Sequence, residues 1–141
     1  MKWWLHHHDK VKTTCTGDLW TCDKAAAKAY GINLVQGEHH RGLATDGSIN
    51  FGSNSGYQAL NLVFGKYNAA RILLLGYDMG HNGKTHWFGD HPEGIQVNSP
   101  FALFIRCFQT INPNDYGIEI INCTPGSKLT HFPMMELEAA L

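Results

Sequence analysis

The sequence of 141 residues contains no apolar run long enough to cross a membrane and no excess of basic charge. Its apolar runs are short, such as residues 72–75 and 101–105, whereas a membrane helix needs about 20 apolar residues. Lysine and arginine together number 11 against 12 acidic residues, and they are scattered along the chain. We therefore expect no membrane span and no nucleic-acid partner. With no signal-peptide core at the amino terminus, we expect a cytoplasmic protein.

Common nucleotide and metal motifs are also missing, since the chain has no Walker motif, no GxGxxG and no HExxH. It has four cysteines, but Cys15 and Cys22 are too far apart for a CxxC pair. Cys107 and Cys123 do not form a second closely spaced pair that could complete a metal site with them. This pattern favours reduced cysteines that are buried as small apolar residues. Charged residues make up only 16% of the chain and hydrophobic residues 43%, which predicts one globular domain over residues 1–141.

Short apolar segments alternate with helical patterns along the chain. We expect strands at residues 18–22, 32–36, 72–75 and 118–121, and helices at 24–30, from Ser53 or Ser55 to 66, at 101–111 and at 134–141. Asp23 and Gly31 fit the two caps of the first of these helices. The alternation predicts an α/β fold with a mainly parallel sheet flanked by helices. Segments 72–75 and 118–121 should be buried parallel strands of that sheet, because each is mainly apolar and neither continues a regular apolar–polar alternation.

Two patterns nominate a binding site. Parallel sheets bind ligands beyond the carboxyl ends of their strands, which selects Asp78, the segment from Asn122 to Thr124, and the loop that starts at Gly37. Asp78 could hold a metal, a ribose hydroxyl or a base nitrogen, or cap the next turn. A helix start has free amides that favour an anion, and here it would involve Ser53, Asn54, Ser55 and Gly56. Simple capping with a tight turn is the alternative for these four residues.

Residues 76–100 have no regular pattern, and a polar segment of that length is often functional. It holds His81, His86, Asp90 and His91, which could supply a general base, a phosphate partner or a metal site, or only loop polarity. His39, His40 and Arg41 could add charge to the same crevice, although solvated loop residues are the simpler interpretation.

Three stretches, in this order, resemble a known family. They are Ser55-Gly56-Tyr57-Gln58-Ala59-Leu60 through Leu75-Gly76-Tyr77-Asp78-Met79, then Thr85-His86-Trp87-Phe88-Gly89-Asp90-His91-Pro92, and finally Gly117-Ile118-Glu119-Ile120-Ile121-Asn122-Cys123-Thr124-Pro125-Gly126-Ser127. The sequence resembles the 6-hydroxymethylpterin diphosphokinase-like proteins, many of them bacteriophage proteins with no assigned activity. The motif order is also similar to that of the bacterial family 42 sialyltransferases.

The resemblance implies a Rossmann-like fold and a nucleotide or nucleotide-sugar donor. Carried over by position, it suggests Ser55, Gly56, Asn122, Thr124 and Ser127 at the nucleotide. His91 or His86 would be the base. If the alignment with the sialyltransferases allows no gap, the position of their base falls on Asp90. The family normally begins with a strand and a Gly-rich turn that holds the donor, and this chain starts after that place. Three explanations of this difference stay open: the chain is truncated, another chain supplies the missing strand and turn, or the nucleotide site has been lost.

Three functions follow from these observations. The first is a transferase that moves a glycosyl or phosphoryl group from a nucleotide-linked donor, with Mg²⁺ as a further candidate ligand and the host cytoplasm as its location if a phage encodes it. The second is a non-catalytic nucleotide-binding or ligand-binding module of the same fold. The third, a metal-dependent hydrolase, rests only on the histidines, and the sequence predicts no specific metal site. The partner is a small molecule in each case, and a homo-oligomer is compatible with all three.

Overall fold

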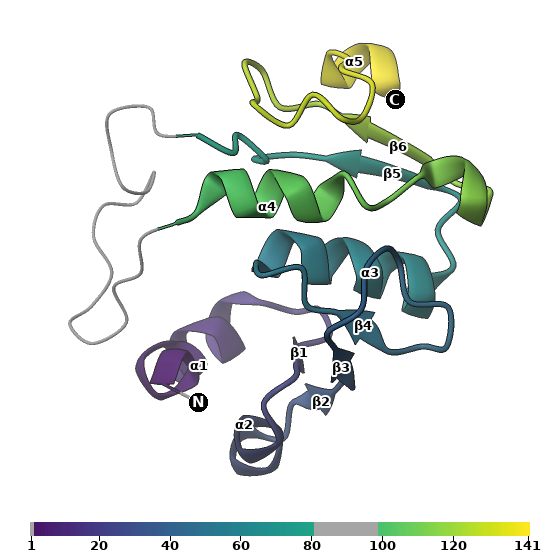
Figure 1. Ribbon diagram of the computed structural model, residues 1–141. Helices are drawn as coiled ribbons and strands as arrows, with labels where there is room; N and C mark the ends of the chain where they lie inside the picture. Colours follow the sequence, from purple (N-terminus) through teal and green to yellow (C-terminus); the bar gives the residue numbers. More distant parts are fainter. Residues whose placement is uncertain (1, 81–98) are drawn as a thin grey trace.

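The computed structural model describes residues 2–80 and 99–141, which form a mixture of helices and short parallel strands (Figure 1). The helices are α1 (Lys2–Thr14), α2 (Lys24–Tyr30), α3 (Ser55–Tyr67), α4 (Phe101–Phe108), the 3₁₀ helix η1 (Pro113–Tyr116) and α5 (Leu137–Ala140). The strands are β1 (Trp20–Thr21), β2 (Asn33–Leu34), β3 (Gly37–Glu38), β4 (Ile49–Asn50), β5 (Arg71–Leu74) and β6 (Glu119–Asn122). Within the described ranges, no helix has the length and apolar character that a membrane crossing requires.

The first strand, helix and strand confirm the sequence prediction. The Asp23 side chain accepts hydrogen bonds from the amides of Ala25 and Ala26 at the start of α2. Gly31 ends the helix with a φ of 65°, in the left-handed region that glycine tolerates best. β1 and β2 then pair in parallel, as expected for two strands joined by a helical crossover.

The segment from Gly37 to Gly52 was predicted to be a loop, and that prediction was wrong at its two ends. β3 and β4 pair in parallel there, with Gly37 opposite Ile49. The amide of Ile49 donates to Gln36 O and that of Phe51 donates to Glu38 O, at 2.9 and 3.0 Å. Each strand has only two residues, and Ile49 is the one large apolar residue in the pair. A pattern so short cannot be separated from a loop in the sequence.

β5 and β6 are parallel neighbours, as predicted, in a register that places Ile72 opposite Ile120. β5 begins and ends one residue before the predicted segment, and β6 begins and ends one residue after it. Leu75, which was expected to be buried, is 56% exposed. Both faces of this pair are covered. Side chains of Ile72, Leu74 and Ile120 pack with α3 and α4 in the main core, whereas Leu73, Ile121 and Cys123 pack with Leu137 and Ala140 of α5. Figure 1 shows α5 on the opposite side of the pair from α4.

Two predicted helices are shorter than expected. α4 ends at Phe108 because the chain turns there, with Thr110 N donating to Cys107 O and Ile111 N donating to Phe108 O. The closing helix begins at Leu137 and not at Met134. Met134 instead forms a parallel bridge with Asn122, so the residues before α5 extend the sheet edge. Tertiary pairing therefore overrides the local helix preference at both places.

The cysteines are unbridged, and only part of the burial expected for them is found. Cys123 is buried, Cys22 and Cys107 are half-buried, and Cys15 is exposed. Burial raises the pKa of the Cys22 thiol, because a thiolate is poorly solvated in a partly apolar environment.

The first helix, α1, has no buried residue, and Trp4 Nε1 donates to Thr21 Oγ1 at 3.3 Å.

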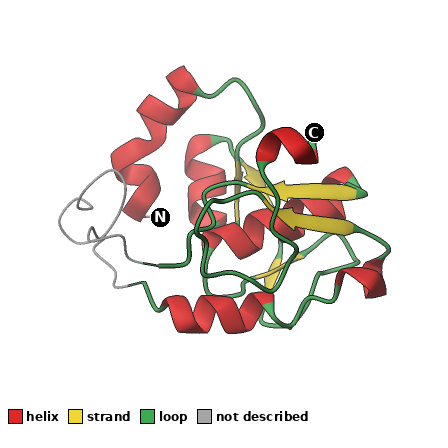
Figure 2. Ribbon diagram, turned by 90° about the horizontal axis from the view of Figure 1, so that it is seen from above, coloured by secondary structure: helices red, strands yellow, loops and turns green. Residues whose placement is uncertain are grey.

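The described strands form three two-stranded parallel sheets, which supports the α/β class. Seen from above, β5 and β6 lie side by side as the longest arrows, with helices around them (Figure 2). A Rossmann-like arrangement and a single domain over the whole chain stay predictions. The parallel strand ends nevertheless position the residues of the candidate site.

Candidate functional site

Three of the predicted site segments meet around Tyr77, which directly precedes Asp78. The Tyr77 amide donates to Thr124 Oγ1 at 2.9 Å, after the end of β6. The Tyr77 hydroxyl donates to Gly56 O at 2.9 Å, in the first turn of α3. The end of β5, the end of β6 and the start of α3 therefore lie side by side.

The polar side chains that follow β6 are buried and satisfied within the protein. Asn122 Oδ1 accepts from the Thr124 amide, while its Nδ2 donates to Ser127 Oγ and Leu129 O. Ser127 Oγ in turn donates to Tyr77 O. These bonds fix the turn after β6 against the end of β5. The exposed charged residues next to these strand ends include Asp78 and Lys128, and the Lys128 amide donates to Asp78 O at 2.8 Å.

The Asp78 carboxylate is exposed, and it forms no hydrogen bond or ion pair with any residue in the described part of the chain. It does not cap the next turn there. The carboxylate oxygens are therefore accessible to a ligand. Binding of a metal and binding of a ribose hydroxyl both stay predictions for Asp78.

The start of α3 is a tight turn followed by a capped helix. Gly52 and Ser53 both have positive φ, 50° and 62°, and the Asn54 amide donates to Phe51 O at 3.3 Å. Positive φ at both central residues is the type I′ pattern. The predicted cap was Ser53 or Ser55, but the structure assigns it to Asn54, whose Oδ1 accepts from the Tyr57 amide at 2.8 Å.

The Asn54 cap leaves two amides of the first turn available. Within residues 2–80 and 99–141, neither Ser55 N nor Gly56 N has an acceptor. Such amides carry partial positive charge at a helix start. Ser55 is exposed, and Gly56 is half-buried because Tyr77 lies against it.

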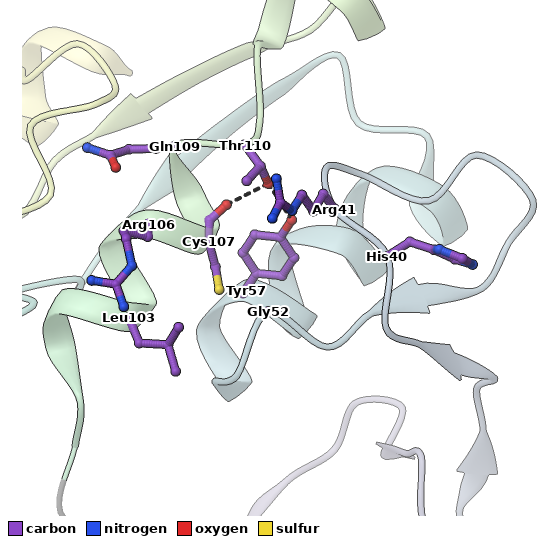
Figure 3. Close-up of a pocket in the computed structure, with 9 residues that line it drawn as sticks. All are labelled: His40, Arg41, Gly52, Tyr57, Leu103, Arg106, Cys107, Gln109 and Thr110. Atoms are coloured by element: carbon purple, nitrogen blue, oxygen red, sulfur yellow. Dashed lines mark hydrogen bonds between the residues drawn. The ribbon is translucent and has the colours of Figure 1, made fainter.

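A cavity of about 460 Å³ lies beside this turn, in the size range of small-molecule sites. Two arginines, Arg41 and Arg106, line it, and we call it the arginine cavity. Figure 3 shows Arg41 next to Thr110 and Tyr57, and Arg106 projecting from α4 on the other side. The remaining lining residues are His40, Gly52, Leu103, Cys107 and Gln109.

The charge of the arginine cavity is uncompensated. Arg41 and Arg106 are both exposed, and neither forms an ion pair with an acidic residue in the part of the chain that the structure describes. His40 adds an imidazole to the lining, although in Figure 3 it lies further along the loop and points away from Arg41. Two guanidinium groups without partners favour an anionic ligand, since guanidinium matches carboxylate and phosphate geometry.

Backbone bonds around Gly42 fix the position of Arg41. Tyr57 Oη donates to Gly42 O at 2.8 Å, and the Gly42 amide donates to Thr110 Oγ1 at 3.0 Å. Thr110 Oγ1 donates onward to Cys107 O at 2.7 Å. Burial raises the pKa of the Tyr57 hydroxyl, so it keeps its proton as a donor at neutral pH.

A second buried side chain, Asn61, ties the same loop to β4. Its Oδ1 accepts from the amides of Ala44 and Asn50, at 2.9 and 3.2 Å, and its Nδ2 donates to Tyr57 O. Asn61 is fully buried. The loop that carries His40 and Arg41 is thus held from α3, from β4 and from the end of α4.

The arginine cavity combines predicted residues with residues that sequence reasoning missed. His40 and Arg41 follow β3 and Gly52 follows β4, so these three lie at the carboxyl ends of a parallel pair, where the sequence rule places ligands. Arg106 and Thr110 were missed, because nothing in the pattern of an amphipathic helix marks one polar residue as facing a cavity. The exposure of His40 and Arg41 agrees with the interpretation as loop residues.

Other predicted residues lie elsewhere. His86, Asp90 and His91 lie outside the described residues. His39 packs edge-on against Phe51, with ring centroids 4.8 Å apart. No three His, Cys, Asp or Glu side chains come together as a metal site within the described ranges.

The comparisons with known proteins give no family for this chain. Neither the protein-family models, nor the curated proteins, nor the solved structures gave a match. The resemblance to the diphosphokinase-like proteins and the sialyltransferases therefore stays a prediction, and the geometry of the arginine cavity carries the functional argument.

Proposed function

We propose that this protein binds a nucleotide-linked small molecule in the arginine cavity and acts as a transferase on it. The observation that carries the proposal is the pair of guanidinium groups of Arg41 and Arg106, which line one cavity of about 460 Å³ and have no acidic partner among the described residues. A phosphate or diphosphate group has the charge and the oxygen geometry that such a pair binds.

The neighbouring turn supports the same ligand class. Gly52 lines the cavity, and the free amides of Ser55 and Gly56 follow it by three and four residues in the chain. Backbone amides at a helix start add favourable interactions with an anion. In this proposal the phosphates lie between the two arginines, and the rest of the donor extends toward the start of α3.

The Rossmann-like arrangement belongs to the same proposal. Parallel pairing in β1/β2, β3/β4 and β5/β6 supports it, as does the position of the cavity after β3 and β4. The buried bonds of Asn122, Thr124 and Ser127 give those residues a positioning role, because their polar atoms are occupied by the protein itself. Direct contact with the donor then falls to the arginines and to exposed groups such as Asp78.

Transfer needs a base, for which we propose His91, with His86 as the alternative and Asp90 beside it. A positioned imidazole can remove the proton from an acceptor hydroxyl near neutral pH. A binding module of the same fold would share the arginine cavity but lack this step. Turnover, measured separately from binding, therefore distinguishes the two functions.

A thermal-shift screen tests the ligand class. CMP, CDP, UDP, ATP and GTP, each with and without Mg²⁺, should include at least one ligand that raises the melting temperature, because a ligand that binds only the native state stabilises it. Nucleosides without phosphate should give a smaller shift at this cavity. Equal shifts with and without phosphate, or no shift with any nucleotide, would contradict the proposal.

A further inference from the structure

A second cavity, of about 580 Å³, borders the first. Both cavities are lined by Gln109 and Thr110, which follow α4. Figure 3 shows Thr110 directed toward Tyr57 and Gln109 directed away from it. The second cavity is bounded further by η1, by the start of β6 and by residues 131–133. We call it the carboxamide cavity, after Gln109, Asn112 and Asn114 in its lining.

Its floor is apolar and belongs to the buried core. Ile111, Ile120 and Phe132 all line it and are at most 2% exposed. Pro113, Ile118 and Pro133 add further apolar surface. Pro113, Ile118 and Pro133 are partly or fully exposed, so a ligand would gain free energy by placing an apolar face against these three side chains.

Its rim carries hydrogen-bonding groups that the protein does not use. The carboxamides of Gln109 and Asn114 are exposed and have no hydrogen-bond partner among residues 2–80 and 99–141. Asn112 differs, since its Nδ2 donates to Asp115 Oδ1 at 2.8 Å. Each free carboxamide offers both a donor and an acceptor.

His131 supplies a fixed acceptor at the same rim. Its Nε2 lies 2.8 Å from Ile111 O, and because a carbonyl oxygen only accepts, Nε2 carries the hydrogen. In the neutral ring, Nδ1 is then left as an acceptor. The ring packs edge-on against Phe132, with centroids 4.9 Å apart, which restricts its orientation.

The lining has no unpaired charge. Glu119 is the one acidic side chain among the described lining residues, and it forms an ion pair with Arg71 Nε at 2.7 Å. The arginine cavity, in contrast, has two unpaired cations. The two cavities therefore select different ligands, the first anionic and the second uncharged.

We propose that the carboxamide cavity is a second small-molecule site, which binds an uncharged ring with hydrogen-bonding edges, of the nucleobase type. Such a ring has apolar faces for the accessible apolar side chains of the lining, Pro113, Ile118 and Pro133. Its edge atoms pair with Asn114, Gln109 and His131 Nδ1. The argument does not depend on the proposed transferase function.

Adenosine is a suitable probe, because it has such a ring and no phosphate. In a titration followed by amide chemical shifts in ¹H–¹⁵N spectra, up to about 10 mM to detect millimolar affinity, we expect shifts at residues 111, 112, 114, 118–120, 131 and 132. Inorganic phosphate, titrated separately, should instead shift residues around Arg41 and Arg106, so failure at one cavity is distinguishable from failure at the other.

Two variants and a control complete the test. Asn114→Ala and His131→Phe should each weaken adenosine binding by about fivefold, the scale of one hydrogen bond, while Asn33→Ala on the exposed β2 should not change it. Asn114→Ala removes an exposed side chain, so its melting temperature should be unchanged, whereas His131→Phe also removes the bond to Ile111 O, so an amide spectrum that retains the wild-type dispersion verifies its fold. Adenosine shifts confined to the arginine cavity, no shifts at all, or unchanged affinity in both variants would overturn the proposal.

Discussion

Tyr57 shows how one side chain serves both stability and the candidate site. It is 1% exposed, packs in the main core, and donates its hydroxyl hydrogen to Gly42 O at 2.8 Å. Its ring lies edge-on to Phe108, with centroids 5.2 Å apart. The aromatic ring therefore contributes burial, and the hydroxyl fixes the backbone next to Arg41.

Replacing Tyr57 with Phe isolates the role of the hydroxyl. We expect Tyr57→Phe to lower the free energy of unfolding by about 1 kcal/mol, the usual net worth of a hydrogen bond, and to weaken phosphate binding severalfold because Arg41 is held less firmly. Urea denaturation and calorimetric titration measure the two effects. Tyr30→Phe is the control, since the Tyr30 hydroxyl forms no hydrogen bond with any described residue. Equal losses in both variants would refute the positioning role.

The choice of base is also a question about single residues. If the protein is a transferase, His91→Ala should reduce turnover by about a hundredfold while the melting temperature changes little, the scale expected for losing a general base. A steady-state assay with the nucleotide found in the screen measures it, and His86→Ala is the matched control. A large loss in His86→Ala alone would transfer the role to His86, and full turnover in both would exclude histidine base catalysis.

At the scale of elements, the loop between β3 and β4 depends on Gly42. Its φ is 76°, and a Cβ there would lie 2.3 Å from Tyr116 Oη. That oxygen accepts from the Leu43 amide at 3.0 Å, so it cannot move without losing the bond. Only glycine satisfies both the backbone conformation and the close contact.

Comparing two glycines tests this claim. Gly31 also has a positive φ, 65°, but a Cβ there would meet no atom within 4 Å. We expect Gly31→Ala to destabilise the protein by about 1 kcal/mol, the strain of the left-handed conformation alone. Gly42→Ala should cost clearly more and should also weaken phosphate binding. Equal losses in urea denaturation would mean that the contact with Tyr116 is not a constraint.

Elements were predictable where their signals are local. α2 has its cap, its alanines and its final glycine within nine residues, from Asp23 to Gly31, and the structure agrees at both ends. β5 and β6 were recognised because apolar residues cluster within them, Ile72 to Leu74 in β5 and Ile120 with Ile121 in β6. β3 and β4 were missed because two-residue strands owe their pairing to neighbours distant in the sequence.

The candidate site was predictable only in part, for the same reason. The strand-end rule selects the loop that carries Arg41, but Arg106 and Thr110 reach the cavity through the packing of α4 against α3. Asn54 caps α3 because the turn before it has two residues with positive φ. The sequence Ser53-Asn54-Ser55 offers three possible caps and does not show which one the turn selects. Asn122, Thr124 and Ser127 look like ligand residues in the sequence, whereas their hydrogen bonds stay within the protein.

For the whole molecule, the distribution of charge matters more than its sum. The net charge is −1, yet Arg41 and Arg106 place two unpaired cations on one cavity. The neighbouring carboxamide cavity has its single acid neutralised by Arg71. A protein with little overall attraction for anions therefore has a cavity that concentrates positive charge, which is how a specific anion site differs from general electrostatic binding.

Calorimetric titration with the tightest nucleotide of the screen tests the central claim most directly. Wild-type protein, Arg41→Gln, Arg106→Gln and the control Lys28→Gln on the exposed side of α2 would be compared at low and high salt. We expect each arginine variant to bind about tenfold more weakly, equal to about 1.4 kcal/mol, with a smaller salt dependence, and Lys28→Gln to bind like wild type. Unchanged affinity in both arginine variants, or an equal loss in Lys28→Gln, would contradict the account.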